Sequence, residues 1–174
     1  MTSGSQTGQF RSSSRRATFG VGFIVAAIVI GVDQLTKAWA VEALADGRRI
    51  HLIWTLQFNL VYNSGMAFSK GTGFGPFIGA LAIIVVIGLI VSLRRVNNSV
   101  TLLATGLIIG GAMGNIIDRL LRGDAWFHGS VIDFIDLQWW PVFNVADMCV
   151  MIGAAMMVFG VSRSQQQGKR ATLS

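Results

Sequence analysis

The chain has 174 residues, of which 52% are hydrophobic and only 13% are charged, and its formal net charge is +6. The charged fraction is about half of that in soluble globular domains, which excludes an ordinary water-soluble protein and indicates a single membrane-embedded domain. The positive charge does not indicate nucleic-acid binding, because the basic residues flank apolar segments instead of forming a stripe interleaved with aromatic residues.

Four apolar segments are long enough to cross a bilayer, since about 20 helical residues span its roughly 30 Å of hydrocarbon. We predict transmembrane helices over residues 17–44, 74–95, 100–121 and 142–163. The first segment also ends in small residues that are similar to a signal-peptide cleavage site. Asp33 and Lys37, one helical turn apart, favour an uncleaved helix instead, since they can pair on one helix face.

The basic residues predict the orientation of the helices. They gather in the N-terminal tail, the loop after the second apolar segment and the C-terminal tail, which by the positive-inside rule face the cytoplasm. We therefore expect cytoplasmic, disordered tails at residues 1–16 and 164–174, and extracytoplasmic segments at residues 45–73 and 122–141.

The first outer segment alternates between apolar and polar residues from Ile50 to Tyr62, a period of two that is typical of a strand. Asn63, Ser64 and Gly65 then predict a turn. We expect a small curled sheet that packs on the helix ends, because unpaired backbone groups are not tolerated in lipid. The second outer segment contains aromatic residues that favour the headgroup boundary, namely Trp126, Phe127, Trp139 and Trp140.

Several polar residues of the apolar segments lie at one depth. At about 1.5 Å per helical residue, Asp33, Asp118 and Asp147 lie roughly 26, 35 and 24 Å from the cytoplasmic arginines. The sequence therefore predicts a polar layer near the outer boundary of the membrane. Its members are Asp33, Lys37, Asn115, Asp118, Arg119, Asn144 and Asp147, with Asp133 reaching it from the outer loop. Glycines of the third segment, including Gly114, allow the helices to approach closely enough to bury this layer.

Two carboxyl groups of such a layer, for example those of Asp133 and Asp147, could act together. In a partly desolvated cleft they cannot both ionise easily, so one remains protonated. The carboxylate could then activate water for attack on a peptide carbonyl while the acid protonates the carbonyl oxygen. From spacing alone, the same residues could equally form a proton relay, or a structural set of ion pairs with the basic residues Lys37, Arg119 and Arg122.

Five short blocks, in this order along the chain, resemble the signature blocks of the lipoprotein signal peptidase (signal peptidase II) family. They are DQLTK from Asp33, NSGMAF from Asn63, GGAMGNIIDR from Gly110, VIDF from Val131 and FNVAD from Phe143. The resemblance implies a bacterial aspartic peptidase with four transmembrane helices, an extracytoplasmic β-cradle and an extracytoplasmic loop helix. It also implies a substrate, a diacylglyceryl-modified prolipoprotein that is cut just before its lipidated cysteine.

The resemblance assigns the catalytic roles to Asp133 and Asp147. We expect substrate-binding or supporting roles for Asp33, Lys37, Asn63, Gly65, Gly114, Asn115, Asp118, Arg119, Asn144 and Ala146. We expect Asp118 to orient Arg119 or Arg122 or to cap the site, and Asp124 and Asp136 to be solvated loop acids. The expected partners are the prolipoprotein and membrane lipids, with no nucleic acid, no metal and no cofactor. We expect a monomer in the bacterial cytoplasmic (inner) membrane, with both termini in the cytoplasm and the active site near the outer leaflet boundary.

Other functions fit the sequence less well. A zinc peptidase is disfavoured because His51 and His128 are far apart and no His-Glu-x-x-His motif occurs. A serine–lysine pair, such as Ser64 with Lys37 or Lys70, is chemically possible. The alternative from another class is a small four-helix proton-coupled transporter, which would need its carboxylate near the membrane midplane.

Overall fold

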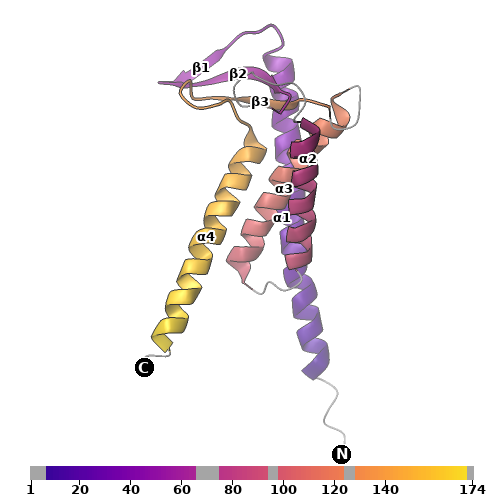
Figure 1. Cartoon of the computed structure of the whole chain (residues 1–174), viewed down its shortest axis with the longest axis vertical. Coiled ribbons are helices and arrows are strands. Elements are labelled where there is room, and N and C mark those ends of the chain that lie inside the picture. The colour runs from indigo at the N-terminus through magenta and orange to yellow at the C-terminus, as the bar shows by residue number, and fades with distance from the viewer. Residues whose placement is uncertain (1–6, 66–74, 94–97, 124–127, 172–174) are drawn as a thin grey trace, which may run out of the picture.

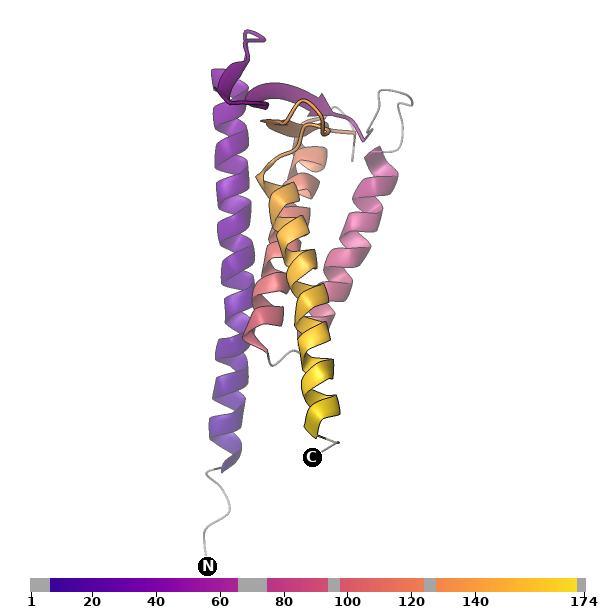
Figure 2. The ribbon, with the colours of Figure 1, turned by 90° about the vertical axis from the view of Figure 1, so that its left-hand side faces the viewer.

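The structure is a computed structural model that describes residues 7–65, 75–93, 98–123 and 128–171. Within these ranges the chain forms four helices that run roughly along the long axis, and a small sheet that lies across one end of them (Figures 1 and 2). The helices are α1 (Thr7–Ala43), α2 (Gly75–Leu93), α3 (Ser99–Leu121) and α4 (Val145–Ala171). The strands β1 (Ile50–Ile53), β2 (Leu56–Asn63) and β3 (Val131–Asp136) form one antiparallel sheet in the order β1-β2-β3.

Three helices are long and apolar enough to cross a membrane, over Gly20–Ala43, Pro76–Leu93 and Ser99–Leu121. α4 contributes a shorter apolar stretch, Val145–Gly160, among the residues searched. Large apolar side chains cover the outside of these helices, as on α2, where Phe77 and Ile84 are 69% and 66% exposed. Such surfaces suit contact with hydrocarbon, so the predicted membrane-embedded helical fold is confirmed at this level.

α3 lies at the centre of the helical part and contacts α1, α2 and α4. Glycines make these contacts close. A Cβ atom at Gly110 would lie 2.8 Å from the backbone oxygen of Ala26 on α1, and one at Gly153 of α4 would lie 2.7 Å from the backbone oxygen of Ala104. Because no real side chain fits in so little space, the glycines allow the helix backbones to touch, as expected for membrane helices.

The predicted strand in the first outer segment is confirmed as two strands, β1 and β2, joined by a turn in which Trp54 has φ 52°. The inner face of the sheet packs on the outer end of α1, where Leu44 of the α1–β1 connection contacts a cluster that includes Ile132 and Phe134. Trp39 of α1 meets the rings of Phe58 and Phe134 edge-on. The sheet is thereby fixed to the helix ends, with β2 in its middle.

The second outer segment differs from its prediction. Residues 131–136 form strand β3, not a loop, because β-branched residues pair with the exposed edge of β2 in a register that places Val61 beside Asp133. α4 begins at Val145, after the start of the apolar segment at residue 142, because Phe143 forms a bridge with Ile135. No helix occurs in the described parts of the two outer segments. Residues 66–74 and 124–127 lie outside the described residues, so the loop helix stays a prediction.

Candidate active site

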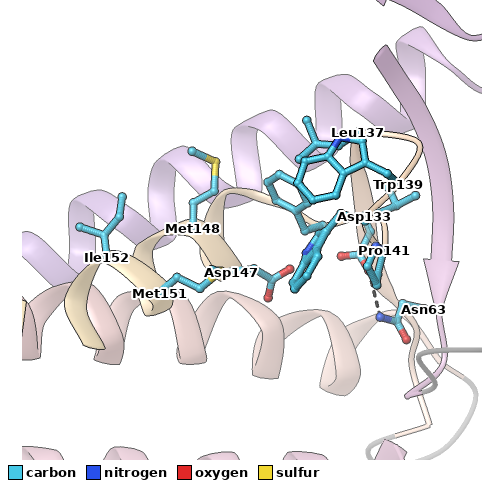
Figure 3. Close-up of a pocket in the computed structure, with 12 residues that line it drawn as sticks. Asn63, Asp133, Leu137, Trp139, Pro141, Asp147, Met148, Met151 and Ile152 are labelled. Atoms are coloured by element: carbon cyan, nitrogen blue, oxygen red, sulfur yellow. Dashed lines mark hydrogen bonds between the residues drawn. The ribbon is translucent and has the colours of Figure 1, made fainter. Parts of the chain in front are cut away.

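A cleft of about 650 Å³ opens between the sheet and the N-terminal end of α4. Asp133 of β3 and Asp147 of α4 both line it, and Figure 3 shows their carboxyl groups pointing into it from different sides. The other lining residues are mainly apolar, and they are Asn63, Leu137, Trp139, Trp140, Pro141, Val142, Phe143, Met148, Met151 and Ile152. The cleft thus combines two carboxyl groups with an apolar wall that extends along α4.

Asp133 is held by two amides at the middle of β3. Its side chain is only 2% exposed, and Asn63 Nδ2 and Asn144 Nδ2 donate to its two oxygens at 2.9 and 2.7 Å. Burial raises the pKa of Asp133 to about 6, the hydrogen bond from Asn63 opposes this shift, and the nearby charge of Asp147 adds to it. Asp133 therefore keeps its proton well into the range where an ordinary aspartate has lost it.

The orientation of the Asn63 amide follows from the turn after β2. The backbone N–H of Gly65 donates to Asn63 Oδ1 at 3.0 Å, which leaves Asn63 Nδ2 to face Asp133. Gly65 has φ 108°, a conformation that residues with a side chain rarely adopt. The predicted pair Asn63 and Gly65 thus acts as one unit, in which the glycine permits the turn and the turn aims the amide.

Asp147 lies in the first turn of α4 and caps this helix together with Asn144. The backbone N–H of Asp147 donates to Asn144 Oδ1 at 2.9 Å, and the backbone N–H of Asn144 donates to Asp147 Oδ2 at 3.1 Å. This reciprocal pair is a capping box, and it satisfies two backbone donors at a helix end that favours negative charge. The other oxygen, Oδ1, accepts from Asn115 Nδ2 at 2.8 Å. Both oxygens of Asp147 are thus hydrogen-bond acceptors.

A buried ionic cluster lies directly beneath these residues. Lys37 is fully buried, and its ammonium nitrogen lies 2.8 Å from each of three oxygen atoms, which belong to Asp33, Asp118 and Asn115. Asp33 accepts from the backbone N–H of Ala146 at 3.0 Å, and Asp118 accepts from that of Ile132 at 3.2 Å. The cluster therefore connects α1 and α3 to the first turn of α4 and to β3, the two elements that carry the cleft carboxyl groups.

With this geometry established, three comparisons with known proteins place the chain. Residues 25–163, most of the chain, match the family model described as signal peptidase (SPase) II. The chain belongs to the signal peptidase II family. The lipoprotein signal peptidase of Mycobacterium leprae (strain Br4923) is 44% identical over 77% of the chain and 67% of that protein. That of Rhodococcus jostii (strain RHA1) is 40% identical over 78% of the chain and 69% of that protein.

A solved structure of a bacterial membrane enzyme agrees with the assignment to signal peptidase II. It superposes with a TM-score of 0.71 at 28% identity, covering 85% of this chain and 91% of that one. Together with the three membrane-length helices, the family makes the chain a multi-pass bacterial membrane protein.

The predicted polar layer of this signal peptidase II chain is assembled in space. Ten of the residues named from the sequence join one network of contacts around the cleft, and they are Asp33, Lys37, Asn63, Gly65, Asn115, Asp118, Asp133, Asn144, Ala146 and Asp147. Gly114 belongs with them, because a Cβ atom there would collide with the Asp33 carboxylate. The network spans α1, β2, α3, β3 and α4, which explains why the blocks lie far apart in the sequence.

Arg119 is placed less directly than the other predicted residues. It is 7% exposed and lies close enough to interact electrostatically with Asp133, Asp118 and Asp147, but its Nη1 has no hydrogen-bond partner among the residues that the structure describes. Asp118 pairs with Arg122 at 2.8 Å, as predicted, and also with Lys37. A buried, unpartnered guanidinium N–H is the kind of group that a substrate oxygen could satisfy.

Two features of the site were not predicted correctly from the sequence. Asp136 is a buried strand residue, not a solvated loop acid, because Gln57, Asn59 and the backbone of Gln138 all donate to it. Although burial opposes the change, these hydrogen bonds hold the pKa of Asp136 below its usual range. The apolar cleft wall of α4 was also missed, although Met148, Met151 and Ile152 recur at helical spacing after Asp147 and could have indicated it.

The alternative chemistries are not supported by the geometry. The ammonium group of Lys37 is committed to Asp33, Asp118 and Asn115, so it is not a neutral base for Ser64, and Lys70 lies outside the described residues. Among the described residues, no group of three or more His, Cys, Asp or Glu side chains could hold a metal ion. Asp133 belongs to β3 and Asp147 to the first turn of α4, and Figure 1 shows that the sheet and the start of α4 lie at one end of the helices. A transporter would need its carboxylate near their middle.

Proposed function

We propose that this chain is an aspartic endopeptidase that removes the signal peptide from diacylglyceryl-modified prolipoproteins, cutting before the lipidated cysteine. The observation that carries the proposal is the unequal pair in one cleft. Asp133 is buried with its pKa raised to about 6, whereas Asp147 is half-buried in the first turn of α4, where a helix end favours negative charge. Two carboxyl groups in such different surroundings are suited to be the acid and the base of one reaction. The names of the relatives supply the substrate class.

In the proposed reaction, Asp147 starts as the carboxylate and Asp133 as the acid. Asp147 takes a proton from a water molecule whose oxygen attacks the scissile carbonyl carbon, while Asp133 gives its proton to the carbonyl oxygen. A neutral tetrahedral diol results. Asp133 then recovers a proton from a diol hydroxyl, Asp147 gives its proton to the leaving nitrogen, and the carbon–nitrogen bond breaks. Both carboxyl groups end as they began, and no covalent intermediate forms.

The apolar wall of the cleft suggests how the lipid is accommodated. Met148, Met151 and Ile152 continue from Asp147 along α4 toward the membrane interior and are 41%, 64% and 50% exposed. We propose that α4 is a fourth transmembrane span, that both termini are cytoplasmic, and that the sheet serves as the cradle for the peptide. The acyl chains would then lie along α4 while the cleavage peptide stretches between the two aspartates. A peptide bond beside a lipid-anchored cysteine lies at this depth by necessity.

The test compares two dyad variants with a matched control from the same strand. Asp133→Asn and Asp147→Asn should each abolish release of signal peptide from a lipidated precursor in detergent micelles. Asp136→Asn removes a carboxylate three residues from Asp133 that points to Gln57 and Asn59, and it should retain cleavage. Folding is checked by thermal unfolding of each purified variant. Wild-type cleavage by folded Asp133→Asn or Asp147→Asn would refute the dyad, and equal cleavage of unlipidated precursor would refute selection by depth.

A further inference from the structure

We propose that Lys37, which does not line the cleft, is a positioning residue that determines which carboxyl group of the dyad is the base. This inference rests on the proposed function. Its route is a short chain of hydrogen bonds that runs from α1 to α4, from the ammonium group of Lys37 through the side-chain amide of Asn115 to the carboxylate of Asp147.

The first step is the donor count of Lys37. An ammonium group has three N–H donors and no acceptor. The three oxygen neighbours of Lys37 at 2.8 Å, on Asp33, Asp118 and Asn115, use all three donors. Since the side chain is fully buried, no water is available to replace any of them. Lys37 can therefore present only an N–H to Asn115.

The second step is the orientation of the Asn115 amide. Its Oδ1 accepts from Lys37 Nζ at 2.8 Å and from Asn144 Nδ2 at 3.1 Å, and its Nδ2 donates to Asp147 Oδ1 at 2.8 Å. If the amide were rotated by half a turn, its NH₂ group would face two donors and its oxygen would face a carboxylate. Lys37 and Asn144 together exclude that arrangement, so Asn115 can offer Asp147 only a donor.

The third step is the consequence for the dyad. Asp147 receives N–H groups from Asn115 and from the backbone of Asn144, and a carboxylate can accept both. Charged groups on the described elements near it include Asp33 and Lys37 of α1, Arg119 of α3 and Asp133 of β3. Asp133 also accepts two amide N–H groups, from Asn63 and Asn144, but it is the more deeply buried of the two carboxyl groups. The shared proton therefore belongs on Asp133, and Asp147 remains the base.

The experiment removes the donor of Lys37 while keeping the charge of the cluster constant. Lys37→Met alone would leave a buried carboxylate unpaired, so it is combined with Asp33→Asn, whose Oδ1 can still accept from the backbone of Ala146. The matched control is Lys37→Gln in the same Asp33→Asn background. The two double variants have equal charge and nearly equal side-chain length, and they differ in whether position 37 carries an N–H donor.

The readout is the pH profile of kcat/KM for a lipidated precursor peptide. Without the donor, only Asn144 Nδ2 at 3.1 Å still holds Asn115 Oδ1, so the amide turns its oxygen toward Asp147 more readily, and that orientation favours the protonated form of Asp147. The acid limb of the profile should therefore lie about one pH unit higher in the Met variant than in the Gln variant, because a hydrogen bond to a charged group shifts ionisation by about that much. A purely structural role for Lys37 would lower the rate equally at all pH values and leave the limbs in place.

Coincident acid limbs in the Met and Gln variants would overturn the proposal. If the Met variant does not fold, Asn115→Asp decides the question, because it keeps an acceptor for Lys37 but replaces the donor toward Asp147 with an oxygen. That variant should also raise the acid limb, and an unchanged limb would overturn the proposal. This inference can fail while the proposed function stands. Loss of cleavage in Asp133→Asn and Asp147→Asn supports the dyad, whatever the Lys37 variants show.

Discussion

Asn144 offers the most direct way to separate stability from chemistry in this site. It is fully buried. Its Oδ1 caps α4 by accepting from the backbone of Asp147 at 2.9 Å, and its Nδ2 donates to Asp133 at 2.7 Å and to Asn115 Oδ1 at 3.1 Å. Asn144→Ala removes both the cap and the amide, whereas Asn144→Ser keeps a capping oxygen but has no amide to reach Asp133 or Asn115. Comparing the two variants therefore isolates the capping contribution, while both lack the amide that orients Asp133.

The expected magnitudes follow from these two contacts. Loss of a helix cap costs about 1 kcal/mol, so Asn144→Ala should unfold at a lower temperature than Asn144→Ser. Loss of a hydrogen bond to a charged or reacting carboxyl group costs about 1.5 to 3 kcal/mol, which corresponds to roughly a 10- to 100-fold fall in kcat/KM in both variants. The assays are thermal unfolding in micelles and initial rates of precursor cleavage. If folded Asn144→Ser cleaved at the wild-type rate, the amide would not orient Asp133 and the reasoning would be refuted.

Three further predictions concern pH, packing and substrate binding. The pKa of Asp133 is raised from 3.8 to about 6, so the folded protein binds this proton more tightly than the unfolded chain does. The bound proton therefore contributes up to about 3 kcal/mol to the free energy of unfolding below pH 4, and this contribution is lost as the pH rises to about 6. Asp133→Asn should therefore raise the unfolding temperature at pH 7.5 and not at pH 4, and an equal shift at both would contradict this. Gly114→Ala should destabilise the protein by about 1 to 3 kcal/mol, because the new Cβ atom would collide with the Asp33 carboxylate. Gly88 has open space around it, so Gly88→Ala should leave the stability unchanged. Thermal unfolding of the two variants checks this. Met151→Ser should raise KM for lipidated precursor several-fold, while Phe159→Ser, equally exposed on α4 but outside the cleft, should leave KM unchanged.

The depth of the polar residues could be predicted from the sequence because helical rise is regular. Counting residues from the arginines at the other end of the helices predicts that Asp33, Asp118 and Asp147 lie at one level, and in the structure they meet through Lys37 and Asn115. The i, i+4 pairing of Asp33 with Lys37 is likewise a local property of a helix, and it is confirmed at 2.8 Å. Local rules were sufficient wherever a residue and its partner lie on one helix or at the same depth on neighbouring helices.

The strand that carries Asp133 could not be predicted from local rules. β3 forms because it pairs with the edge of β2. The two strands are far apart in the sequence, since Asn63 of β2 and its partner Asp133 of β3 are separated by 70 residues. The same long-range pairing makes Asp136 a buried acceptor, since Gln57 and Asn59 come from β2. The start of α4, in contrast, could have been predicted, because Asn144 and Asp147 have the spacing of a capping box.

A count of the charges in and beside the polar layer gives an independent reason for a shared proton. Among the described residues of the layer and dyad, together with the partly exposed Arg122 beside them, there are three cations, Lys37, Arg119 and Arg122, and four carboxyl groups, on Asp33, Asp118, Asp133 and Asp147. The ion pairs of Lys37 and Arg122 balance Asp33 and Asp118, which leaves Arg119 facing the dyad. One proton on the dyad makes the whole set neutral. A dyad with two protons would leave Arg119 as an unbalanced buried cation, and a dyad with no proton would leave an unbalanced carboxylate. Desolvation makes both of these states unfavourable. The composition of the cluster thus favours the singly protonated dyad that general acid–base catalysis needs.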